Sequence, residues 1–186
     1  MSVSLANTLS ALSRAFEVAG VDWFLFGAQA AILRGSRRMT ADVDVTVLLG
    51  GVHLDRVLDA LAVEDILPRF ELDADFIDRA RVLPLIHDSE MPVDVVVGGP
   101  GLDEYFFERA EALQVAATVI RVPRREDLIS MKLLAGRPHD LQDAEAMARA
   151  GSVDLDELRS FVEGMAEALA DDAIRERLEA LLSTIE

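Results

Sequence analysis

All segments of this chain that have the composition of β-strands lie before Pro123, and the sequence after it has the periodicity of α-helices. Before that proline, short runs rich in β-branched and aromatic residues alternate with helical stretches. Strands are expected at 21–26, 43–49, 81–88 and 92–98, with one or two more within 113–123. The pattern predicts an α/β (α+β) fold, in which residues 1–123 form one domain around a mixed central sheet and residues 124–186 form a C-terminal helical region.

Helices are predicted wherever apolar residues recur at spacings of three and four. Before Pro123 these stretches are 4–19, 28–34, 53–63 and 102–110, and after it they are 124–135, 138–149, 154–169 and 171–184. Gly136 and Gly151 mark breaks in the C-terminal region, because glycine commonly ends a helix. We therefore expect a mixed α/β half followed by an all-helical half.

The chain has 186 residues, of which 34 are acidic and 18 basic, so its formal net charge is −16. This balance excludes a chain-wide basic surface for nucleic acid and leaves only a local basic patch or a bridging metal for such a contact. The absence of cysteine excludes disulfides, thiolate metal sites and a cysteine nucleophile, and it fits a reducing compartment. The N-terminal segment lacks a long apolar run, so we expect no signal peptide, no membrane span and a cytoplasmic location.

Three aspartates lie in or directly beside the predicted strands. Asp42 and Asp44 share one face of a strand because they are two residues apart, and Asp94 stands among valines in the strand at 92–98. Clustered carboxylates repel one another unless a cation lies between them. If the two strands are neighbours, the three carboxylates form a site suited to Mg²⁺ or Mn²⁺. The alternative for the first two acids is an exposed strand face, where this spacing is common.

A glycine turn and a basic cluster precede these acids. Gly27 lies where the strand at 21–26 is expected to turn into a helix, 15 residues before Asp42. Backbone N–H groups at a helix N-terminus attract phosphate, and glycine allows its close approach. A basic cluster follows at Arg34, Arg37 and Arg38, with the hydroxyl of Thr40 beside it. Guanidinium groups in such a cluster are suited to phosphate oxygens.

The order of these features resembles the nucleotidyltransferase superfamily, in which a glycine followed by glycine or serine precedes an acid–apolar–acid strand and a third acid on a later strand. Here the corresponding residues are Gly27-Ala28, the strand that carries Asp42 and Asp44, and Asp94. The stretch 38–44 is similar to the form found in AbiEii-type toxins and related small nucleotidyltransferases. The resemblance implies a polymerase-beta-like mixed sheet followed by helices.

The resemblance continues in residues 123–147, where Lys132 and the pair Asp140 and Asp143 are similar to a lysine segment followed by D-x-x-D. Lys132 is the only lysine, which indicates that a compact positive charge matters there, as it does for phosphate. The alternatives are a solvated helix surface for Lys132 and helix capping for Asp140, which follows Pro138 in the first turn. On the phosphate interpretation, Lys132→Ala weakens nucleotide binding and leaves the fold intact.

The resemblance also implies a role for each residue. Asp42, Asp44 and Asp94 would be the catalytic residues and the ligands of two Mg²⁺ (or Mn²⁺) ions that bracket the α-phosphate of a nucleoside triphosphate. The implied nucleotide-binding residues are Gly27, Ala28, Arg38, Thr40, Lys132, Asp140 and Asp143. Ala28 departs from the family because it has no hydroxyl to contact the phosphates and keeps only its backbone N–H.

The acceptor and the biological role stay open at this stage. A toxin-type enzyme would modify RNA or protein and would have an antitoxin partner. An antibiotic-type enzyme would modify a cationic small molecule such as an aminoglycoside, and the negative charge of this chain favours that encounter. The remaining alternatives are a Mg²⁺-dependent phosphohydrolase that uses the same acids, and a degenerate module that binds nucleotide or a partner without catalysis.

Overall fold

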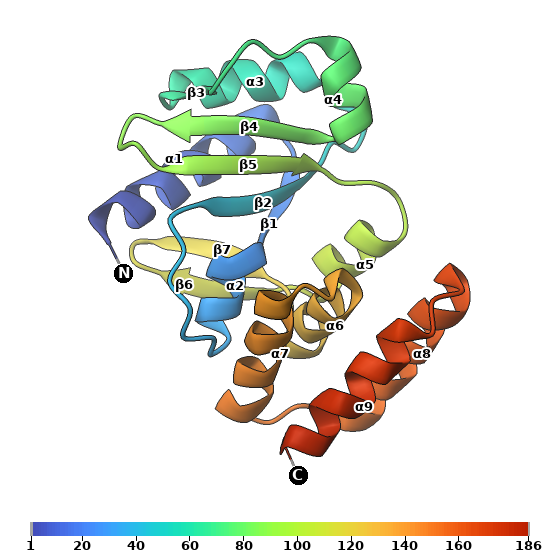
Figure 1. The fold of residues 1–186 in the computed structure, drawn as a ribbon. Coiled ribbons are helices and arrows are strands. Elements are labelled where there is room, and N and C mark those ends of the chain that lie inside the picture. The colour runs from blue at the N-terminus through green and yellow to red at the C-terminus, as the bar shows by residue number, and fades with distance from the viewer. Residues whose placement is uncertain (1, 186) are drawn as a thin grey trace. The chain divides into compact units, whose positions relative to one another are not determined.

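A computed structural model gives the fold of the protein (Figure 1) and describes residues 2–185, apart from the side chains of Ala74, Asp75 and Asp78. The strands are β1 (Asp22–Phe26), β2 (Val43–Leu48), β3 (Ile66–Pro68), β4 (Val82–His87), β5 (Pro92–Val97), β6 (Glu111–Val115) and β7 (Thr118–Val122). The helices are α1 (Val3–Ala19), α2 (Gly27–Leu33), α3 (Leu54–Val63), α4 (Ala74–Ala80), α5 (Leu102–Arg109), α6 (Arg125–Ala135), α7 (Pro138–Ala150), α8 (Leu155–Leu169) and α9 (Ala173–Ile185). The predicted mixed α/β fold with a helical C-terminal half is confirmed.

The chain forms two compact units. The first unit contains residues up to Gln29 together with Thr40–Pro123, and the second contains Ala30–Met39 together with the helices after Pro123. The predicted domain boundary placed all of residues 1–123 in one part, whereas here the short segment 30–39 groups with the C-terminal helices. No helix within residues 2–185 is both long and apolar enough to cross a membrane.

The first unit is built on a five-stranded sheet with the order β1-β2-β5-β4-β3. The pair β2–β5 is parallel and the other neighbouring pairs are antiparallel. Helices α1 and α3 pack against each other and lie behind the sheet in the view of Figure 1. Strands β6 and β7 form a separate hairpin, so the sequence at 113–123, expected to be one or two strands, forms most of this hairpin.

The alternation of residues along β2 and β5 determines which side chains leave the core. Val43, Val45 and Val47 are fully buried, as are Val93 and Val95 of β5. Successive residues of a strand point to opposite faces, so the residues between these valines project from the other face of the sheet. The two acids of the strands, which are partly exposed, therefore lie on the face away from the valine core.

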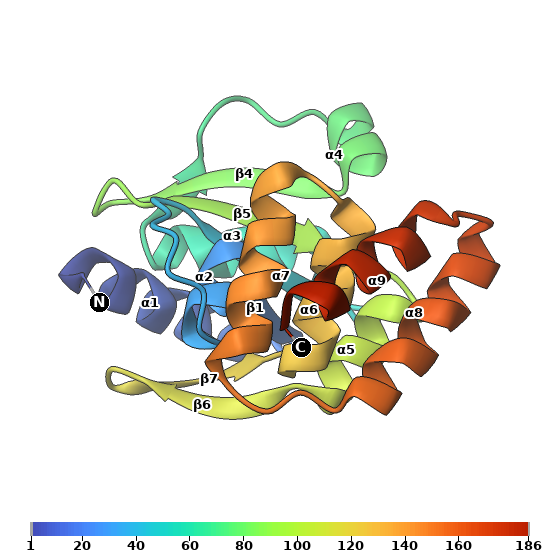
Figure 2. The same cartoon turned by 60° about the horizontal axis from the view of Figure 1, so that its bottom comes forward.

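The second unit contains four longer helices, drawn from two sides in Figures 1 and 2. Helix α6 packs against α7 and α8, and α9 packs against α7 and α8. The core that these helices share is formed by Leu128, Ile129, Leu133, Met147, Leu158, Val162, Ile174 and Leu178. These residues recur at helical spacing, which is why the sequence after Pro123 predicts helices and no strands.

Candidate active site

Two of the predicted site acids lie side by side. Strands β2 and β5 are neighbours, as the cation-site hypothesis requires, and their parallel register pairs Asp44 directly with Asp94. Neighbouring strands are about 4.8 Å apart, so both carboxylates emerge next to each other from the same face of the sheet. Both side chains are partly exposed and can be reached from solvent.

Asp42 lies immediately before β2, two residues ahead of Asp44. The hydroxyl of Thr40 donates a hydrogen bond to Oδ1 of Asp42. Thr40 is predicted from the resemblance to contact nucleotide, and in this structure its hydroxyl orients an acid of the candidate site. This contact holds the carboxylate just ahead of the strand that carries Asp44.

Gly27 lies directly beneath the Asp44 carboxylate. It connects β1 to α2 with φ of +64°, and its neighbour Phe26 pairs with Asp44 in the β1–β2 register. A Cβ atom on Gly27 would lie 2.0 Å from Oδ2 of Asp44, which is far inside van der Waals contact. The turn therefore requires glycine both for its backbone conformation and for the space that the carboxylate fills. Ala28, the next residue, is buried.

Replacing Gly27 with alanine is expected to destabilise the protein more than the same change at Gly20. Both glycines have positive φ, but no heavy atom lies within 4 Å of the Cβ position at Gly20. Gly20→Ala should cost about 1–2 kcal/mol for the left-handed backbone alone. Gly27→Ala should cost at least about 1 kcal/mol more, because the Asp44 carboxylate must move. Urea unfolding of the two variants measures the difference. Equal losses of unfolding free energy would mean that the close approach of the Asp44 carboxylate to Gly27 adds no cost.

Arg69 contacts the third acid. Its guanidinium forms an ion pair with Oδ1 of Asp94, and both side chains are about one-third exposed, at 36% and 33%. Arg69 follows the three-residue strand β3. Sequence reasoning did not identify it, because β3 is too short to show a strand pattern and the ion pair joins residues 25 positions apart. No local signal in the sequence points to this residue.

The three acids supply the hard oxygen donors that Mg²⁺ and Mn²⁺ prefer, and two of them stand on neighbouring inner strands of the sheet, with the third just ahead of one strand. In the part of the chain that the structure describes, no three acidic or histidine side chains are already gathered closely enough to hold a metal. In this arrangement Thr40 contacts Asp42 and Arg69 contacts Asp94. The donor set therefore fits a divalent cation, and binding would require Asp94 to exchange its partner.

The predicted nucleotide contacts of the C-terminal half form a buried ion cluster in the second unit. The Lys132 ammonium lies 2.8 Å from Oδ1 of Asp140 and 3.0 Å from Oδ2 of Asp143, and all three residues are buried. This excludes the solvated-surface interpretation of Lys132. Its role in nucleotide binding stays a prediction, but the expectation that its substitution leaves the fold intact no longer follows. Removing one member of a buried ion cluster leaves the other charges without compensation.

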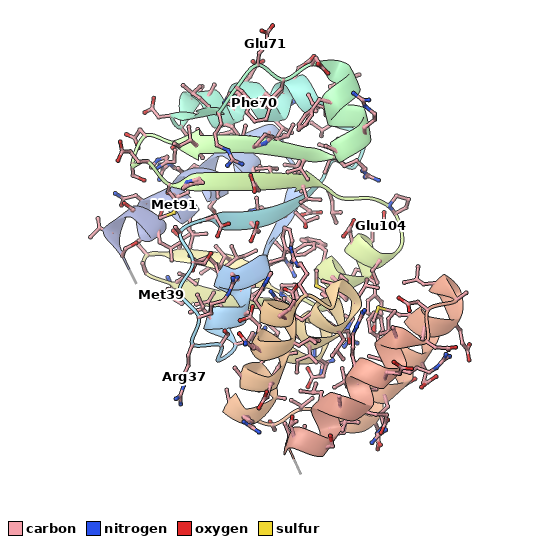
Figure 3. All side chains as sticks on the ribbon, in the orientation of Figure 1. Arg37, Met39, Phe70, Glu71, Met91 and Glu104 are labelled. Atoms are coloured by element: carbon pink, nitrogen blue, oxygen red, sulfur yellow. The ribbon has the colours of Figure 1, made fainter. Side chains whose placement is uncertain are left out.

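Two residues of the segment 30–39 complete the cluster. The hydroxyl of Ser36 donates to Oδ1 of Asp143 at 2.6 Å, and Nε of Arg38 lies 3.6 Å from Oδ2 of the same residue. Ser36 is buried, whereas Arg38 is exposed. Arg37, between them, extends away from the protein in Figure 3. Arg38 is thus the residue of the basic cluster that combines a contact to the ion cluster with access to solvent.

Lys132 and Arg137 both donate hydrogen bonds to the Asp140 carboxylate, and Nε2 of His139 lies 3.7 Å from its Oδ2. Burial alone would raise the pKa of its carboxyl, but hydrogen bonds from Arg137 and Lys132 outweigh burial and hold the pKa below its ordinary value. A lowered pKa in the folded state stabilises the protein above the unfolded pKa, which is about 3.9 for aspartate, and this stabilisation disappears as the pH falls through the folded pKa. The interpretation of Asp140 as a simple cap of α7 is therefore incomplete, because its carboxylate belongs to the ion cluster.

We expect the free energy of unfolding to fall more steeply below pH 4 for the parent protein than for Asp140→Asn, because the variant has no proton to bind at that position. Urea unfolding followed by helical circular dichroism between pH 7 and pH 3 measures both profiles. Parallel profiles would show that Asp140 does not contribute to acid stability. Ordinary acidic surface residues are common to both proteins and cancel in the comparison.

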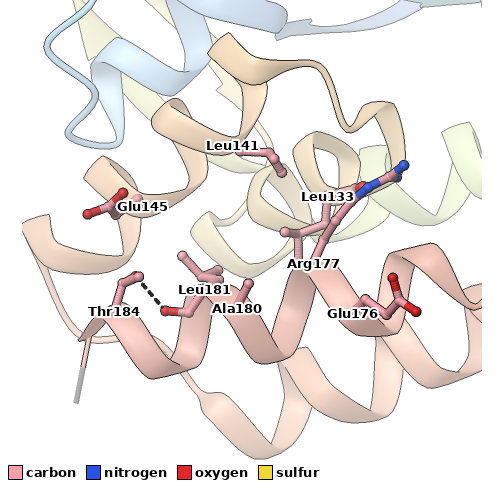
Figure 4. A pocket seen from close by; sticks show the side chains of 8 residues that line it. All are labelled: Leu133, Leu141, Glu145, Glu176, Arg177, Ala180, Leu181 and Thr184. Atoms are coloured by element: carbon pink, nitrogen blue, oxygen red, sulfur yellow. Dashed lines mark hydrogen bonds between the residues drawn. The ribbon is translucent and has the colours of Figure 1, made fainter.

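An apolar groove lies elsewhere in the second unit, between helices α6, α7 and α9 (Figure 4). Its volume is about 290 Å³, and it is lined by Leu133, Leu141, Glu145, Glu176, Arg177, Ala180, Leu181 and Thr184. The guanidinium of Arg177 donates to the carbonyls of Leu133 and Leu134, so it covers the C-terminal end of α6. The predicted site residues lie outside this groove.

Comparison with known proteins identifies relatives in sequence and in fold. The model of a family described as "Nucleotidyltransferase of unknown function (DUF6036)" matches residues 5–184. None of the curated protein sequences matches the chain. The resemblance to AbiEii-type toxins stated above has no counterpart among these matches.

Three solved structures have a similar fold. The solution structure of the antibiotic-resistance factor ANT(2'')-Ia has 15% identity and a TM-score of 0.56, over 99% of this chain and 94% of that one. A crystal structure of ANT(2")-Ia in complex with adenylyl-2"-tobramycin has 13% identity and a TM-score of 0.53, and the match covers 99% of this chain and 100% of that one. An antigenic nucleotidyltransferase-like protein from Paracoccidioides brasiliensis has 16% identity and a TM-score of 0.50, and the match covers 97% of this chain and 94% of that one. At these identities the likeness concerns the fold.

Proposed function

The chain belongs to the nucleotidyltransferase family whose model matches residues 5–184, and on this premise we propose that Asp42, Asp44 and Asp94 form its catalytic site. The proposed reaction moves a nucleoside monophosphate from a nucleoside triphosphate to an acceptor hydroxyl. The observation that carries the proposal is the register between β2 and β5, which places Asp44 beside Asp94, with Asp42 two residues earlier.

The chemistry is a displacement at the α-phosphorus. A bond forms between the acceptor oxygen and the α-phosphorus, the bond to the oxygen that bridges to the β-phosphate breaks, and pyrophosphate leaves. Divalent cations held by Asp42, Asp44 and Asp94, when bound, supply positive charge to the phosphate oxygens and the leaving group. The proton of the acceptor hydroxyl passes to a carboxylate, for which Asp94 is the candidate because, by analogy with the family, it is the acid nearest the acceptor side.

The remaining residues of the first unit position the acids and the nucleotide. Gly27 leaves room for the Asp44 carboxylate, and the backbone N–H of Ala28, the next residue of α2, is the proposed phosphate contact. Thr40 orients Asp42 through its hydroxyl. Arg38, Lys132, Asp140 and Asp143 stay the further nucleotide-binding residues that the resemblance implies, and Arg38 is the exposed cation among them.

The net charge of the chain indicates which chemical class of acceptor the protein attracts. A net charge of −16 attracts cations and repels polyanions, so we propose a cationic small molecule as the acceptor class. A toxin-type enzyme with an antitoxin partner, which acts on RNA or protein, is the competing proposal from the resemblance. The two proposals differ in the chemical fraction that receives the nucleotide.

The experiment is incubation of the purified protein with Mg²⁺ and each α-labelled nucleoside triphosphate, together with separated small-molecule, RNA and protein fractions of a cell lysate. Label in the small-molecule fraction supports the cationic acceptor, and label in RNA or protein supports the toxin-type role. Free nucleotide released without acceptor would indicate a phosphohydrolase. Nucleotide binding without transfer or release would indicate a non-catalytic module. Asp44→Asn is the control that should lose the label.

A further inference from the structure

Arg69 lies in the same row of the sheet as two predicted metal ligands. Its backbone N–H donates to the carbonyl of Pro84 at 3.0 Å, and Pro84 pairs with Asp94 in the β4–β5 register. Asp94 pairs in turn with Asp44. Arg69, Pro84, Asp94 and Asp44 therefore follow one another across the sheet, at intervals of about 4.8 Å.

The side chain of Arg69 reaches across the intervening strand to Asp94. Two strand spacings separate the backbones, about 10 Å, which a long arginine side chain and an aspartate can span together. Pro84, between them, is buried and contributes no charge. The backbone of Arg69 is already held by Pro84, so the ion pair is an additional contact rather than the one that fixes this segment.

The ion pair between Arg69 and Asp94 also lies where a cation from solvent can replace Arg69. Both side chains are about one-third exposed, and ion pairs in contact with water contribute little to stability. A divalent cation at Asp44 and Asp94 carries twice the charge of Arg69 and competes for the same carboxylate. The ion pair therefore offers Asp94 a counter-charge that a cation can replace.

We propose that Arg69 is a built-in counter-ion of the metal site, which neutralises Asp94 in the metal-free protein and gives way when a divalent cation binds. The inference rests on the proposed function, because it takes Asp94 to be a cation ligand. Arg69 is then a positioning residue that sets how tightly the site holds metal before nucleotide arrives. It also reduces the repulsion between the Asp44 and Asp94 carboxylates in the resting protein.

The test is a Mn²⁺ titration in the absence of nucleotide, with the free ion followed by electron paramagnetic resonance. Arg69→Gln removes the competing charge and should tighten Mn²⁺ binding about two- to fivefold. Arg69→Lys keeps the charge and should stay near the parent value. The matched control is Arg14→Gln, because Arg14 forms an exposed ion pair with Glu64 in the same unit and its loss changes the net charge equally.

Three results would contradict the account, and they separate its two parts. Unchanged or weaker Mn²⁺ binding by Arg69→Gln, together with lost binding by Asp44→Asn, overturns the counter-ion inference and leaves the metal site standing. If Arg69→Gln and Arg14→Gln tighten Mn²⁺ binding equally, the effect comes from the change in net charge alone. That result also overturns the counter-ion inference and leaves the metal site standing. Binding that Asp44→Asn and Asp94→Asn do not weaken overturns the proposed site itself.

Discussion

Replacing Lys132 with methionine is expected to lower the free energy of unfolding of the second unit by about 3–5 kcal/mol, the range for breaking a buried ion pair. The physical reason is that Asp140 and Asp143 stay buried and lose the ammonium that lies within 3.0 Å of each. Methionine preserves most of the side-chain volume, so the loss reports the charge rather than a cavity. Urea unfolding followed by helical circular dichroism measures it.

Arg137→Met is the matched control for this prediction. Arg137 also contacts Asp140, at 2.5 Å, but its side chain is 64% exposed. Its loss should cost less than the loss of Lys132, because Arg137 contacts one carboxylate of the cluster whereas Lys132 contacts two. Trp23, the only tryptophan, lies in the first unit, so its fluorescence shows whether that unit stays folded in either variant. A loss below about 1 kcal/mol in Lys132→Met would contradict the structural role of the ion cluster.

Asp44→Asn is expected to reduce nucleotidyl transfer by about 10²–10³-fold, which corresponds to several kcal/mol of transition-state stabilisation by a bound cation. The substitution keeps the shape of the side chain and removes its charge. Asp44 lies between Asp94 on the neighbouring strand and the Gly27 turn, so no other acid can take its place without a change of backbone. Initial rates with saturating Mg²⁺ and nucleoside triphosphate give the ratio.

Asp22→Asn is the control for this second prediction. Asp22 is an exposed acid at the opposite end of β1 from Phe26, which pairs with Asp44. The control removes the same charge and should leave the rate unchanged. A rate for Asp44→Asn within about threefold of the parent would contradict a ligand role, because loss of a metal contact has a much larger effect.

The sequence was sufficient to predict the fold class and most of the longer elements. Valines at alternate positions predict β2 and β5, because such strands bury one face, and the acids between the valines then project from the other face. The helices after Pro123 follow from their apolar spacing. Strand β3 was not predicted, because three residues carry too little periodicity, and α4 was not predicted either.

The sequence was less informative about partners. The spacing of Lys132 and the D-x-x-D pair indicated that these residues belong together, but not that they form a buried cluster with Ser36. Proline is usually found at sheet edges or bulges, yet β4 lies inside the sheet, where Pro84 pairs with Asp94. Contacts such as Arg69 with Asp94 depend on which strands become neighbours, and local sequence patterns do not encode that choice.

The measurement that tests the central claim most directly is thermal melting of the parent and of Asp44→Asn, each with and without Mg²⁺ and a non-hydrolysable nucleoside triphosphate. Without ligand, the variant should melt at the same or a higher temperature, because one of the clustered charges is gone. With ligand, the parent should gain stability and the variant should lose most of that gain, since only a ligand bound to the folded state stabilises it. A variant that melts clearly lower without ligand, and is stabilised by ligand as much as the parent, would contradict the metal site.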